Sequence, residues 1–175
     1  MQNKPTMEEL IQKVEKLKST GELDLSMEED LSIAIMNLIS LEEHFYFTGG
    51  KTGKNEYFDL LNQTREIRKG LLAKMIDKHE GETWCIAKHL LAATMRMMEV
   101  GTKLQSSNKK EEAHEMFKRA YEIYSLFWAL RLKLVNLDGM KKIDDARLNI
   151  HEKFMSDKSM TPEDLIARLV DCCKE

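Results

Sequence analysis

A predicted helical hairpin decides the fold, and the sequence encodes it at residues 41–72 as LEEHFYFTGGKTGKNEYFDLLNQTREIRKGLL. An apolar helix acquires Glu42, Glu43 and His44 here, turns at the glycine-rich segment 49–53 and returns as a second helix. Charged groups inside an apolar hairpin need compensation, because an unpaired carboxylate is costly to remove from water. The hairpin is therefore the organising element of the predicted fold and the best lead to chemistry.

Helical periodicity continues on both sides of this hairpin. Capping-box patterns start at Thr6 and Ser26, Asn108 resembles a third, and Thr83 can cap another helix. Predicted helix 27–48 is apolar around most of its circumference and should therefore be central. The full set of predicted helices covers residues 7–18, 27–48, 55–78, 84–106, 109–136, 141–155 and a last segment from 161.

No segment keeps the two-residue period of a strand, so the predicted fold class is all-α. Long helices joined by short turns predict an antiparallel four-helix bundle core at residues 27–136 with short flanking helices at both ends. We expect one helical domain over residues 1–175, with less tightly packed C-terminal helices at 141–175.

Composition narrows the function classes. With 42% hydrophobic and 33% charged residues, the 175-residue chain is typical of one globular domain. A net charge of −3 gives no basic footprint for nucleic acid, and no apolar run approaches the roughly 18 residues needed to span a bilayer. Three cysteines argue against a disulfide framework, and the polar N-terminus lacks a signal-peptide core. We therefore expect a cytoplasmic protein without a nucleic-acid or membrane partner.

The glycine-rich segment invites comparison with a phosphate-binding loop. That motif requires GxxxxGK[ST] between a strand and a helix, but its first glycine would fall at Phe45, and the preceding segment is a predicted helix. We interpret the segment as an ordinary turn. Lys51 and the amides that begin the next helix still offer a place for an anion, because a helix N-terminus favours negative charge.

The carboxylates of the hairpin are a candidate metal site. A turn near residues 50–52 would align Glu42 and Glu43 with the level of residues 59–63, and Asp59 can share a helix face with Glu66. Converging carboxylates suit Mg²⁺, a hard cation that prefers oxygen ligands and keeps several waters for substrate phosphates.

These residues resemble the core of the MazG-like all-α nucleoside triphosphate pyrophosphohydrolases, or of an all-α branch beside them. The family pattern is EExxE followed, after a gap, by ExxD. Glu42 and Glu43 match its opening, and Glu56 to Asp59 matches ExxD, whereas Tyr46 stands in place of the third glutamate and Glu66 to Lys69 gives only ExxK. The resemblance implies that Mg²⁺, held by Glu42, Glu43, Glu56, Asp59 and Glu66, positions a water against the α–β phosphoanhydride.

A second polar stripe follows predicted helix 84–106. Lys88, His89 and Arg96 could bind substrate phosphates, since arginine offers a bidentate fork. The alternative for this stripe is an ion-pair network between helices. The corresponding alternative for the hairpin acids is that they pair with basic residues on solvated faces: Arg65, Arg68 and Lys69.

Two hypotheses about function follow. The first is a Mg²⁺-dependent nucleotide pyrophosphohydrolase, or a relative that only binds nucleotides, with metal on the hairpin acids and phosphates on Lys51, Lys88, His89 or Arg96. The second is a non-catalytic helical bundle that acts by self-association or by binding a protein partner through methionine-rich helix faces. Under either hypothesis we expect a homo-oligomer, most simply a dimer.

Overall fold

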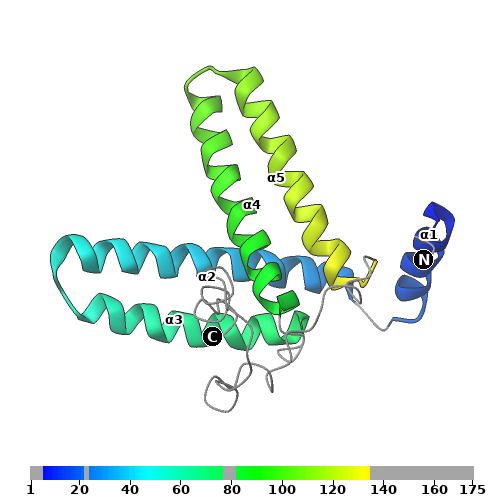
Figure 1. The fold of residues 1–175 in the computed structure, drawn as a ribbon, viewed down its shortest axis with the longest axis horizontal. Helices are drawn as coiled ribbons and strands as arrows, with labels where there is room; N and C mark the ends of the chain where they lie inside the picture. Colours follow the sequence, from blue (N-terminus) through cyan, green and yellow to red (C-terminus); the bar gives the residue numbers. More distant parts are fainter. Residues whose placement is uncertain (1–5, 22–23, 77–81, 135–175) are drawn as a thin grey trace, which may run out of the picture.

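The computed structural model describes residues 6–21, 24–76 and 82–134, and of Met7, Lys18 and Glu82 it describes the backbone alone. All regular structure in these ranges is helical, which confirms the predicted all-α bundle. The helices are α1 (Met7–Ser19), α2 (Leu25–Thr52), α3 (Glu56–Met75), α4 (Glu82–Ser106) and α5 (Lys110–Arg131) (Figure 1). The helices predicted at 141–155 and from 161 lie outside the described residues.

The helices pair into two antiparallel hairpins (Figure 1). Helices α2 and α3 form one hairpin, α4 and α5 form the other, and the second hairpin runs across α2. Helix α2 contacts its own hairpin partner α3 and also α4 of the second hairpin, as expected for a central helix. Helix α1 is set apart from the two hairpins (Figure 1), and its Lys13 Nζ donates a hydrogen bond to the carbonyl oxygen of Lys133, just after α5, at 2.6 Å.

The buried core lies where the two hairpins meet. Its members come from the first half of α2, the last turns of α3, the first turns of α4 and the end of α5. Beyond this junction each hairpin extends outward on its own (Figure 1), so the other described helices do not cover its outer part. The buried apolar residues of this core are Ile35, Met36, Leu72, Met75, Ile76, Trp84, Ala87, Leu91 and Phe127.

Helix N-termini agree with the predicted caps at one position out of four. Thr6 forms the predicted capping box, because its hydroxyl accepts from the Glu9 amide at 3.3 Å and its own amide donates to the Glu9 carboxylate at 2.7 Å. Helix α2 begins earlier than predicted, because the Asp24 carboxylate accepts from the amides of Ser26 and Met27. Helix α4 already begins at Glu82, which places Thr83 inside it.

The predicted cap at Asn108 is also wrong. Asn108 adopts a left-handed φ of 60° and belongs to the α4–α5 turn, a conformation that asparagine tolerates better than most residues. Lys109 occupies the cap position of α5 without a side-chain hydrogen bond.

The glycine-rich turn is shorter than predicted. Gly49 and Gly50 remain helical, α2 runs on to Thr52, and the chain reverses at Gly53, whose φ of 67° suits glycine. Gly49 is buried, and the ring of Phe58 of α3 lies close to it. A Cβ at this position would lie 2.9 Å from that ring, so glycine allows α2 and α3 to approach closely. This added helical turn shifts the register of the hairpin.

Candidate functional site

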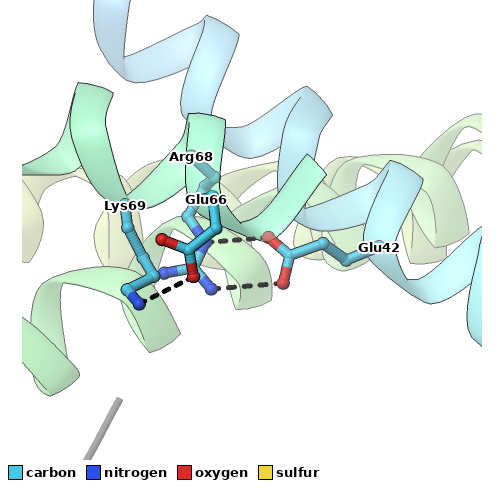
Figure 2. Close-up of polar contacts among 4 residues, drawn as sticks. All are labelled: Glu42, Glu66, Arg68 and Lys69. Carbon is cyan, nitrogen blue, oxygen red and sulfur yellow. Dashed lines mark hydrogen bonds and ion pairs between the residues drawn. The ribbon is translucent and has the colours of Figure 1, made fainter. Parts of the chain in front are cut away.

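Glu42 is bound to a buried arginine of the facing helix (Figure 2). Arg68 Nε donates to Glu42 Oε1 at 2.8 Å, and Arg68 Nη2 donates to Oε2 at 3.1 Å, which makes the pair bidentate. The Arg68 side chain is 1% exposed and that of Glu42 is 14% exposed. Both carboxylate oxygens of Glu42 therefore hold α3 against α2.

This pair corrects the predicted register of the hairpin. Glu42 was expected at the level of residues 59–63, but it lies opposite Arg68, about two helical turns farther along α3. The cause is the helical conformation of Gly49 and Gly50, which moves the reversal of the chain to Gly53. Glu42 is consequently separated from Asp59, its predicted neighbour.

Glu43 points to the other hairpin. Its Oε2 lies 3.2 Å from Arg96 Nε of α4, and Arg96 Nη2 donates to the Ser40 hydroxyl at 2.6 Å. The charged groups of this pair are about half exposed, so the pair ties α4 to α2 at the edge of the junction. The interpretation of Arg96 as part of an interhelical ion-pair network is thus the one that its contacts support.

The remaining predicted metal ligands are dispersed along α3. Glu66 pairs with Lys69 one turn away, at 2.9 Å (Figure 2), and Glu56 lies 3.9 Å from Lys54 on the exposed N-terminal turn. Asp59 is exposed. Within the described residues, no three acidic, histidine or cysteine side chains are grouped so as to hold a metal ion. As arranged, these residues do not fit a Mg²⁺ site, which needs several oxygen ligands at one point.

The predicted phosphate-binding residues do not converge either. Lys51 lies in the last turn of α2, at the tip of its hairpin, whereas Lys88 and His89 lie near the start of α4, next to the core residues Ala87 and Leu91. Arg96 is engaged by Glu43 and Ser40. The structure therefore places Lys51 at the tip of one hairpin and the other three residues on α4 of the other hairpin.

Two contacts between α2 and α5 were not predicted from the sequence. Arg131 Nε donates to Glu28 Oε2 at 2.7 Å with both side chains largely buried, and the Ser32 hydroxyl lies 2.7 Å from the Tyr124 hydroxyl. The partners are 103 and 92 residues apart in sequence. The available signal was Ser32 itself, a polar residue inside an apolar helix, because a buried hydroxyl requires a partner.

One exposed charge cluster stays within a single helix. Arg119 on α5 lies 2.9 Å from Glu115 and 3.3 Å from Glu122, and these carboxylates, Glu115 first, raise the pKa of the guanidinium. Exposed pairs of this kind contribute little to stability. These two ion pairs lie along one face of α5 and include none of the predicted site residues.

The functional evidence rests on this geometry. No protein-family model matches the chain, and neither the curated proteins nor the solved structures include a match to it. In the part of the chain that the structure describes, no helix combines the length and apolar character needed to cross a membrane.

Proposed function

We propose that this protein is a non-catalytic helical bundle in the cytoplasm, which acts by self-association or by binding another protein. One contrast supports the proposal. Three of the predicted metal ligands, Glu42, Glu43 and Glu66, are paired with basic side chains. By contrast, Leu41, Leu60 and Ile67 of the same hairpin are 39%, 40% and 59% exposed. Exposed apolar side chains that gather into one patch are typical of surfaces that bind another protein.

The ion pairs explain why charged groups occur in this apolar hairpin without assigning them to catalysis. Glu42 and Arg68 pair across α2 and α3, and this pairing offsets the cost of removing the buried guanidinium from water. Glu43 and Arg96 form a half-exposed pair between α2 and α4. Binding Mg²⁺ at Glu42 would require its carboxylate to leave the buried Arg68. A nucleotide pyrophosphohydrolase that uses Glu42, Glu43, Glu56, Asp59 and Glu66 would therefore need a rearranged hairpin.

Calorimetry separates the two hypotheses. Titration of the native protein with Mg²⁺ and Mn²⁺ is expected to give no saturable heat, and incubation with a panel of nucleoside triphosphates is expected to release no pyrophosphate. The matched variant is Glu42→Gln/Glu43→Gln. Metal binding by the native protein that this variant loses, together with pyrophosphate release, would contradict the proposal and restore the enzymatic hypothesis.

A further inference from the structure

The α2/α3 hairpin carries a ladder of mostly apolar residues along one side. The register is set by the Glu42–Arg68 pair and by the contact between Gly49 and Phe58, so positions can be matched level by level across the two helices. Members recur every three or four residues, which keeps them on one side of each helix. This hairpin stripe consists of Leu38, Leu41, Phe45 and Thr48 on α2, and of Leu71, Ile67, Thr64 and Leu60 at matching levels on α3. Leu41, Ile67 and Leu60 are its exposed members, whereas Thr64 is buried and Leu71 packs against the core at one end of the stripe.

The stripe lies on the side of the hairpin away from α4 and α5. Helix α2 contacts those helices through Glu28, Ser32, Ser40 and Glu43. At about 100° per residue, the stripe residues of α2 are on the opposite side of the helix, and the handedness of α3 puts its stripe residues on that same side. None of the eight stripe residues is charged. Among the described helices, α4 and α5 therefore pack on one face of the hairpin and leave the stripe on the other face uncovered, except near Leu71, which packs against the core.

We infer that the hairpin stripe is a two-fold interface with a second copy of this chain, in which α3 lies antiparallel to the α3 of the other copy. This inference rests on the proposed function, and it names the partner. The paired hairpins would make a four-helix core between subunits, in addition to the core within each subunit. Two-fold contacts place the same patch on both copies, so one self-complementary stripe is sufficient.

The size of the stripe fits a stable dimer. Helix α3 has 20 residues, which corresponds to about 30 Å at the rise of an α-helix. Two helices side by side are roughly 20 Å wide, so one hairpin face covers about 600 Å² in projection. Accessible area exceeds projected area, and standard-size interfaces bury about 800 Å² per partner. One hairpin face thus supplies most of the surface that a stable dimer requires.

Charges at the two ends of the stripe set its direction. Glu56 and Lys74 are both exposed and lie on the same side of α3, because their separation of 18 residues equals five helical turns. An antiparallel arrangement brings Glu56 of one copy to Lys74 of the other, twice per dimer. A parallel arrangement would instead bring like charges together at both ends, which is unfavourable.

Sedimentation velocity over a range of protein concentrations tests the interface. The native protein is expected to be a dimer, and Leu60→Glu/Ile67→Glu is expected to weaken the dimer at least about 100-fold, because four glutamates would enter an apolar interface. The matched control is Phe47→Glu, since Phe47 is 57% exposed but lies on the α4-facing side of α2, one turn after Glu43. Circular dichroism checks that all variants remain helical.

Charge reversal tests the direction. Glu56→Lys is expected to weaken the dimer several-fold at low salt, and the added Lys74→Glu is expected to restore it. A native protein that remains monomeric at about 100 µM would overturn the inference, because its dimer dissociation constant would then lie above that concentration. A dimer that Leu60→Glu/Ile67→Glu leaves intact would also overturn it. Failed restoration would overturn the antiparallel arrangement. A dimer that dissociates as expected but releases pyrophosphate in a Mg²⁺-dependent manner would leave the interface standing and refute the proposed non-catalytic function.

Discussion

Replacing Glu42 with glutamine is the most direct test of the role assigned to this carboxylate. Glu42→Gln keeps the shape of the side chain and one acceptor oxygen, but it removes the charge that faces the Arg68 guanidinium at 2.8 and 3.1 Å. If Glu42 is a structural residue, the change destabilises the protein whether or not metal is present. If Glu42 is a metal ligand, removing its charge leaves the metal-free protein unharmed or more stable.

The magnitude follows from burial. Removing one member of a buried ion pair costs about 3–5 kcal/mol, because the other charge is left without its counterion. The Glu42 side chain is 14% exposed and glutamine retains one acceptor, so we expect a loss of about 2–4 kcal/mol. That loss is a large fraction of the roughly 5–15 kcal/mol by which native proteins are stable.

Urea denaturation of the metal-free protein, followed by circular dichroism, measures this loss. With an m value of about 1–3 kcal/mol per M, the midpoint should fall by roughly 1–2 M. Glu43→Gln is the matched control, because its pair with Arg96 is half exposed and such pairs contribute only about 0–1 kcal/mol. A loss below about 1 kcal/mol for Glu42→Gln, or equal losses for the two variants, would refute the reasoning.

Three further predictions concern stability, each measured by the same denaturation assay. Gly70→Ala places a Cβ in open space on α3 and should stabilise the protein by about 0.5–1 kcal/mol. Gly101→Ala places a Cβ 2.5 Å from the Phe117 ring, so its free energy of unfolding should be about 1–3 kcal/mol lower than that of Gly70→Ala. Equal effects would mean that the Phe117 ring moves aside freely. Tyr124→Phe removes the hydroxyl that lies 2.7 Å from Ser32 and should cost about 0.5–1.5 kcal/mol, an expectation that fails if the exposed control Tyr121→Phe costs as much. Asp24→Ala removes the cap of α2 and should cost about 0.5–2 kcal/mol, and an unchanged midpoint would count against that role.

Local signals predicted the helices well, since they depend on neighbouring residues. Apolar spacing located all five described helices, and the Thr6–Glu9 capping box has the predicted hydrogen bonds. Their ends were less accurate, because several side chains near a terminus compete to cap it. Asp24, two residues before Ser26, satisfies the first amides of α2 and so displaces the predicted start.

The candidate site depended on register, which local signals set poorly. Glycine is compatible with both a turn and a helix, and in the structure Gly49 is helical and leaves the space that the ring of Phe58 occupies. Once Gly49 and Gly50 were helical, Glu42 faced Arg68 rather than the level of Asp59. The sequence did contain this alternative, because Arg68 had the right charge on the facing helix, but spacing did not indicate that Arg68 would be buried.

The sequence by itself determined an all-α fold, the helical hairpin at its centre and the presence of charged groups within it, because periodicity and composition are properties of the chain. Only the tertiary structure decided what those charges face. Glu43 meets Arg96 and Glu28 meets Arg131 across distances in sequence that no local pattern spans. A carboxylate surrounded by other carboxylates attracts a metal, whereas one beside a buried guanidinium holds two helices together, and that surrounding is set by how the hairpins pack.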